Sequence, residues 1–153
     1  MAARLRTIAD AVVTALNAQT FSQSFTATRV WEEFESLPDL ATGYDVKVRP
    51  VTSYQTELHS RSATVAEYQI ECWIRAKMTA DVSNDFKSHI DEAGDLVEEI
   101  REFVEPNLAS SSELNPAGAN WSGTEAIVVY GEQVLKRANF FESQLTFTFS
   151  DYR

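Results

Sequence analysis

The chain has 153 residues, of which 44% are hydrophobic and 24% are charged, and its formal net charge is −10. This length is typical of one domain, so we expect a single domain over residues 1–153. The sequence has no run of about 18 apolar residues, which excludes a transmembrane helix. Its net negative charge disfavours nonspecific binding to nucleic acid or anionic membranes. Its single cysteine excludes an internal disulfide.

The first predicted element is an amphipathic helix over residues 3–18. Its apolar side chains recur at spacings of three and four residues: Leu5, Ile8, Val12, Ala15 and Leu16. Polar residues such as Asp10 interrupt the segment where a signal peptide would be apolar, so we expect a retained helix and synthesis in the cytoplasm.

Two strands are predicted after this helix. Residues 25–34 are rich in β-branched and aromatic types and predict a strand. Residues 44–50 alternate apolar with charged side chains, which predicts a half-buried strand.

Residues 64–77 predict an unusually long strand, because apolar and polar residues alternate throughout. One face would carry Thr64, Ala66, Tyr68, Ile70, Cys72, Ile74 and Ala76. The other would carry Val65, Glu67, Gln69, Glu71, Trp73, Arg75 and Lys77. At about 3.3 Å per residue such a strand spans roughly 45 Å, so we expect it to project past the core.

The C-terminal half predicts one more helix and two more strands. The helix starts at Ser83 or Asn84 and runs to about Glu105, before Pro106. Its buried stripe is predicted as Phe86, Ile90, Ala93, Val97, Ile100 and Val104, and its outward face as acidic, with Asp91, Asp95, Glu98, Glu99 and Glu102. Composition predicts a loop over 107–124, and strands over 125–130 and 140–153. The resulting fold class is α+β, a mainly antiparallel sheet with two helices on one face, in the order α-βββ-α-ββ.

Three residue groups that could carry chemistry favour a plain structural role instead. His59, with Ser60, Arg61 and Ser62, is predicted to lie in a turn before the long strand, and neighbours in sequence do not make a catalytic triad. His89 shares a helix face with two carboxylates but has no further ligands for a metal. Cys72 lies on the apolar face, where a thiol acts as a small hydrophobic group. Because no phosphate-binding, dinucleotide-binding, zinc or kinase motif is present, we expect no enzyme activity, no cofactor and no metal.

Trp73 points to an assembly role, because it stands between Glu71 and Arg75 on the polar face of the long strand. Tryptophan and arginine are the residue types that anchor protein interfaces. The alternative is that Trp73 packs under a local loop or helix. The residues predicted to contact other subunits or partners are Trp73, Arg75, Lys77, Glu71, His59, Arg61 and Trp121.

Several phrases resemble a family of small phage proteins of the tail and neck, described as tail terminators or tail completion proteins. These phrases are "IADAVVTALNAQTFSQSF", "RVWEEFESLPDL" and "YDVKVRPVTSYQTELHSRSATVAEYQIECWI", followed by the acidic helix "DLVEEIREFV" and the closing strand "FFESQLTFTFSDYR". The resemblance covers nearly the whole chain and rests on pattern and short phrases. It implies an α+β subunit of a ring, commonly a hexamer, with no catalytic residues.

The resemblance further implies a virion protein that caps the completed tail tube, halts its polymerisation and meets the head connector. Its partners would be copies of itself, the tube protein and the connector, and DNA would pass through the lumen without specific binding. The nearest alternative is another neck ring, such as a head-completion or adaptor protein. An alternative of another class is a small-molecule-binding or enzymatic α+β domain, which would need a pocket with converging polar groups.

Overall fold

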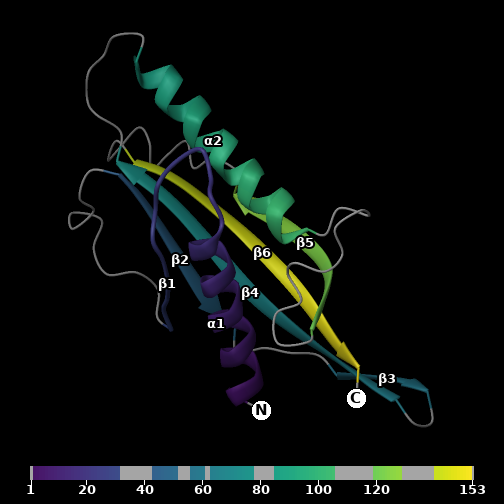
Figure 1. Ribbon diagram of the computed structural model, residues 1–153. Coiled ribbons are helices and arrows are strands. Elements are labelled where there is room, and N and C mark those ends of the chain that lie inside the picture. Colours follow the sequence, from purple (N-terminus) through teal and green to yellow (C-terminus); the bar gives the residue numbers. More distant parts are fainter. Residues whose placement is uncertain are drawn as a thin grey trace.

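The structure, a computed structural model, describes residues 2–31, 43–51, 56–60, 63–77, 85–105, 119–128 and 140–152. Two helices, α1 (Ala2–Ala18) and α2 (Asp85–Val104), lie on the same face of a β-sheet (Figure 1). The predicted α+β class is therefore confirmed, with both helices on one side of a mostly antiparallel sheet.

The sheet contains the five predicted strands and one short addition. The five form the path β1-β2-β4-β6-β5, in which β1–β2 is the only parallel pair and the others are antiparallel. The strands are β1 (Ala27–Arg29), β2 (Tyr44–Pro50), β3 (Thr56–Ser60), β4 (Ala63–Lys77), β5 (Asn120–Val128) and β6 (Phe140–Tyr152). The added strand, β3, pairs only with the beginning of β4.

β4 is the central strand and, at 15 residues, the longest. Along one edge it pairs with β6, from Val65 opposite Tyr152 to Lys77 opposite Phe140. Along its other edge it pairs first with β3 and then with β2. The first two residues of β4 lie beyond the β6 pairing, and the β3–β4 hairpin extends past the ends of the other strands (Figure 1). The predicted projection of the long strand is thus confirmed.

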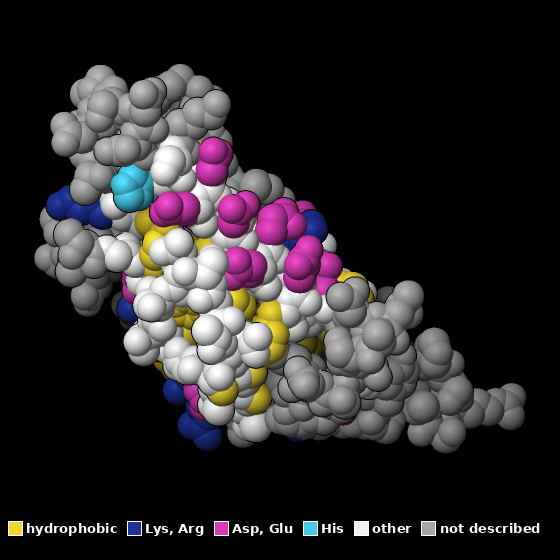
Figure 2. All heavy atoms as spheres, turned by 45° about the horizontal axis from the view of Figure 1, so that its top comes forward, with side chains coloured by type: hydrophobic (Ala, Val, Ile, Leu, Met, Phe, Trp, Pro, Cys, Tyr) yellow, Lys and Arg dark blue, Asp and Glu magenta, His cyan; other side chains and the backbone are white. Residues whose placement is uncertain are grey.

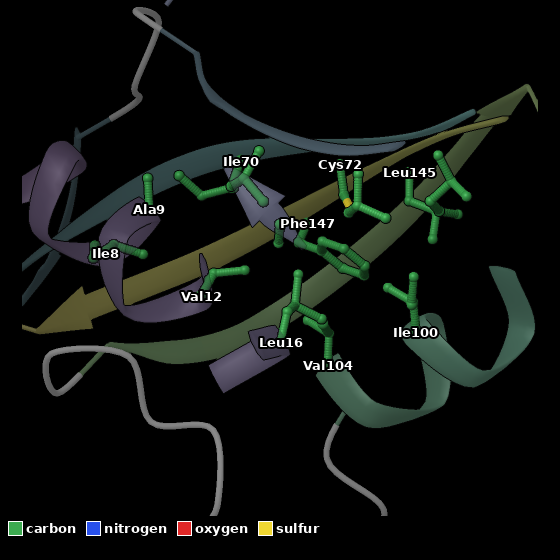
Figure 3. Packing of buried hydrophobic residues seen from close by; sticks show 14 of the residues in the cluster. Ile8, Ala9, Val12, Leu16, Ile70, Cys72, Ile100, Val104, Leu145 and Phe147 are labelled. Carbon is green, nitrogen blue, oxygen red and sulfur yellow. The ribbon is translucent and has the colours of Figure 1, made fainter. Parts of the chain in front are cut away.

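The core lies between the sheet and the two helices. It is formed by the residues that the alternation along the strands and the helical spacing along α1 and α2 place on the inner faces. β4 buries every second residue from Ala66 to Ala76, and β6 buries Leu145, Phe147 and Phe149 on the same face. Figure 3 shows side chains of α1 and α2 pointing at these strands. The buried helix residues are Leu5, Ile8, Ala9, Val12 and Leu16 in α1, and Ala93, Leu96, Val97, Ile100 and Val104 in α2. Leu96 was missing from the predicted stripe.

Three sequence-based boundaries were wrong. The segment before the long strand was interpreted as a turn, but its backbone forms β3. The first strand is shorter than predicted, since β1 covers only Ala27–Arg29 of the predicted strand over 25–34, of which residues 32–34 lie outside the described residues. β5 begins at Asn120, inside the stretch predicted as a loop. The rest of that loop, residues 107–118, lies outside the described residues.

Candidate assembly surface

The sheet has a second face, which neither α1 nor α2 covers, and we call it the helix-free face. It consists of the residues of β2, β4 and β6 that alternate with the core residues: Asp45, Lys47, Arg49, Glu67, Gln69, Glu71, Trp73, Arg75, Lys77, Glu142, Gln144, Thr146, Thr148 and Ser150. The period-two pattern fixes this division, since successive side chains of a strand point to opposite faces. Gln144 and Thr146 of β6 are buried there, so the accessible part of the face lies over β2 and β4.

Trp73 lies near the middle of this face and is held there by its neighbours on β4. Its indole Nε1 donates a hydrogen bond to Oε2 of Glu71, at 3.2 Å. The guanidinium of Arg75 lies 5.6 Å from the centroid of the ring on the other side, within the range of a cation–π contact. The ring is half-buried. A tryptophan fixed in this way loses little conformational freedom when a partner covers it.

Arg75 is the main correction to the predicted surface. It does lie on the predicted face, but it is only 7% exposed, whereas the sequence suggested a solvent-facing side chain. Its Nε is 2.9 Å from Oε2 of Glu142, which faces it on β6. Burial lowers the pKa of Arg75, and the nearby carboxylates of Glu142 and Asp45 oppose that shift. The pattern of β4 alone could not reveal Glu142, because β6 is far away in sequence.

Two more ion pairs lie on this face, one between β2 and β4 and one within β2. Nε of Arg49 is 3.6 Å from Oε2 of Glu71, the same carboxylate that accepts the hydrogen bond from Trp73. Nζ of Lys47 is 3.2 Å from Oδ1 of Asp45 and donates to the hydroxyl of Thr28 at 2.9 Å. Cations and carboxylates alternate, so the face combines little net charge with many polar groups. Such a surface suits a protein partner better than a polyanion.

The other predicted contact residues do not all join this surface. Lys77 does, at the exposed end of β4. Trp121 does not, because it lies on β5 opposite Phe149 of β6 and packs half-buried against the core. Its Nε1 donates a hydrogen bond to the Thr124 hydroxyl at 2.9 Å. The backbone of His59 lies in β3, distant from Trp73 along the β4 register, and its side chain is not described. Arg61 lies outside the described residues.

The residue types that might carry chemistry are dispersed. Cys72 is fully buried in the core, and burial raises the pKa of its thiol to about 12. His89 is on α2 with Nδ1 3.9 Å from Glu92, and both side chains are more than two-fifths exposed. Among the described residues, no three His, Cys, Asp or Glu side chains are close enough to hold a metal ion. A hollow beside the end of α1 is lined by Leu16, Phe21, Phe25 and uncharged polar residues, with no titratable group.

The outer face of α2 is acidic, as predicted. Figure 2 shows its carboxylates as a row along the helix. Asp91, Asp95, Glu98 and Glu102 are exposed, and Glu99 also accepts a hydrogen bond from the backbone N–H of Ser22 at 2.9 Å. No helix of the described chain is long and apolar enough to cross a membrane.

Comparison with known proteins adds no family to this description. Neither the protein-family models nor the curated proteins searched gave a match to the chain.

Proposed function

We propose that this protein is a structural subunit of a phage virion, which forms a ring at the end of the tail tube. The ring would cap the tube, stop its polymerisation and present the surface that the head connector joins. The proposal starts from the sequence phrases that resemble tail terminator and tail completion proteins. It draws support from the α+β fold with both helices on one side, which is the fold class that this resemblance implies.

The observation that carries the proposal is the helix-free face with Trp73 at its centre. A closed ring needs a heterologous interface, in which two different patches of each subunit meet. This two-layer fold offers two different sides, a polar sheet face with a held tryptophan and an opposite side formed by helices with an acidic surface. Each copy can therefore present one side to each neighbour. We propose that the helix-free face is one of the two patches and that Trp73 is its anchor.

The acidic composition suits a passage for DNA, because the formal net charge of the chain is −10. Acidic groups near a lumen would repel phosphates and leave the genome free to slide without specific binding. The partners that follow from this role are the tube protein, the connector and further copies of the chain.

The test is to locate the protein and to disrupt the face. Cryo-EM of purified particles should show a closed ring between tube and connector, and mass photometry should detect rings of the free protein or rings formed when tubes are added. The variant Trp73→Ala should abolish ring formation while the circular dichroism spectrum stays native. Trp31→Ala is the matched control, because Trp31 is 48% exposed but follows β1 at the sheet edge. Particles that lack the protein at the tail end would overturn the function, and rings of unchanged stability in Trp73→Ala would overturn the role of the face.

A neck ring on the head side shares this size and assembly logic, and the loss phenotype separates the two roles. Deleting a tail terminator gives overlong tails, whereas deleting a head-completion or adaptor protein leaves heads without tails. We expect overlong tails.

A further inference from the structure

The sheet has a very short strand, β1, at one edge. Side chains of α1 contact this strand and limit the pairing of its backbone groups with another molecule. In a sheet, an unpaired edge strand presents N–H and C=O groups that a strand of another molecule can pair with. β1 pairs with β2 in parallel, and the N–H of Val30 donates to the carbonyl of Val48 at 2.9 Å. Alternate residues of the strand therefore bond to β2, which leaves the backbone groups of Ala27 and Arg29 pointing away from the sheet.

Asn17 of α1 occupies both outward groups of Ala27. Its side-chain Nδ2 donates to the carbonyl of Ala27 at 3.0 Å, and the N–H of Ala27 donates to Oδ1 at 2.7 Å. One amide side chain thus makes the two hydrogen bonds that a neighbouring strand would make at this position. We call this pair of bonds the Asn17 clamp.

α1 also binds the side chain of Arg29, the second outward residue of β1, through the guanidinium and not through the backbone groups. Nε of Arg29 donates to Oδ1 of Asp10, seven residues before Asn17 and on the same side of α1. The guanidinium of Arg29 lies over the ring of Trp31, 5.1 Å from its centroid. The opposite edge strand, β5, is interrupted instead by two irregularities in its pairing with β6, at Trp121/Gly123 and Ala126/Val128. Bulges of this kind twist an edge and discourage strand addition.

We infer that the Asn17 clamp blocks the β1 edge against strand addition by a second copy of this chain. Two copies carry identical edges, and two β1 strands could pair antiparallel about a two-fold axis if the clamp were absent. The clamp therefore directs self-association to the faces of the sheet and away from its edge. This inference stands on the Asn17 geometry and does not depend on the proposed function.

The variant Asn17→Ala tests it, because alanine removes both bonds and favours helix, so α1 itself is not weakened. The matched control is Thr14→Ala, since the Thr14 hydroxyl donates only to the carbonyl of Asp10 within α1. Sedimentation velocity over a concentration series should show an additional dimer in Asn17→Ala, with self-association tighter than in wild type by about tenfold or more. Thr14→Ala should match wild type. Hydrogen exchange of the Ala27 amide in Asn17→Ala should be faster at low concentration and slow again as the dimer forms.

Two further variants separate edge pairing from a simple loss of stability. Asn17→Asp keeps the acceptor for the Ala27 N–H but loses the donor, so it should self-associate less than Asn17→Ala. If Asn17→Ala fails to fold, Asn17→Asp still tests whether loss of one bond of the clamp increases self-association. Adding Thr28→Glu to Asn17→Ala should reverse the association, because antiparallel pairing centred on Thr28 would place two glutamates opposite each other across the joined edges. Folded Asn17→Ala and Asn17→Asp proteins that sediment like wild type would overturn the inference, as would association that Thr28→Glu does not reduce.

Discussion

Replacing Arg75 by methionine should destabilise the fold markedly, although Arg75 lies on a face without a helix. Methionine keeps much of the side-chain length but removes the cation. Glu142 would then lose the charge 2.9 Å from its Oε2, in a position where its side chain is only 20% exposed. Removing one partner of a fully buried ion pair costs about 3–5 kcal/mol. Because the Glu142 carboxylate keeps some contact with water, we expect a loss of about 2 kcal/mol, which includes the cation–π contact with Trp73.

Equilibrium urea denaturation followed by far-UV circular dichroism measures this loss. With a denaturant slope of about 2 kcal/mol per molar urea, the midpoint should fall by about 1 M. Lys77→Met is the matched control, because Lys77 lies on the same strand and the same face but is exposed, so its midpoint should move by less than about 0.3 M. The double variant Arg75→Met with Glu142→Gln should recover about half of the loss, since no uncompensated carboxylate remains. Equal midpoints for Arg75→Met and Lys77→Met would refute the interpretation of Arg75 as an embedded ion-pair residue.

Three further predictions concern the buried Cys72 thiol, the core residue Phe147 and the ion pair between Arg4 and Asp151. The Cys72 thiol, whose pKa burial raises to about 12, should resist alkylation by iodoacetamide in the folded protein at pH 8 and react in urea. Fast labelling of the folded protein would contradict the burial of this thiol. The thiol has a pKa of 9.0 when unfolded and about 12 when folded, so the free energy of unfolding should fall as pH rises above 9 towards 12. Cys72→Ala has no thiol at this position, so its stability should fall less steeply over the same range. Phe147→Ala, at a fully buried position, should cost about 3–5 kcal/mol in the same urea experiment, and a loss below about 1 kcal/mol would argue against the packing in Figure 3. Arg4→Gln, which removes the 2.9 Å ion pair to Asp151, should cost about 1–2 kcal/mol, because Asp151 is only 9% exposed, and added salt should reduce the difference from wild type.

The elements that the sequence predicted well are those with a strict repeat. β4 alternates without interruption, so its buried side from Ala66 to Ala76 was correctly predicted. The stripe of α1 and most of the stripe of α2 follow helical spacing in the same way. β3 was missed because its five residues include two with polar, turn-like character, His59 and Ser60, and its strand conformation comes from pairing with β4.

The surface was predicted less completely than the core, because pairing between distant strands decides it. The alternation correctly assigned Trp73 and Arg75 to the face opposite the core. It could not show that Glu142 would lie beside Arg75 and withdraw it from solvent. Trp121 was assigned to a loop by the composition around it, yet pairing with β6 extends β5 over it and turns its ring to the core. Composition describes local preference, and a partner strand overrides it.

The long pairing of β4 with β6 also sets the order in which the protein can fold during synthesis. Lys77 faces Phe140, so on the order of 60 residues must be made after β4 before its partner appears, which takes roughly 3–12 s at ribosomal rates. During that interval the longest strand can pair only with β2 and β3, and one of its edges stays open. Nascent chains are therefore most exposed to aggregation after β4 and before β6, and translation slowed between α2 and β6 should lower the soluble yield more than the same delay before β2.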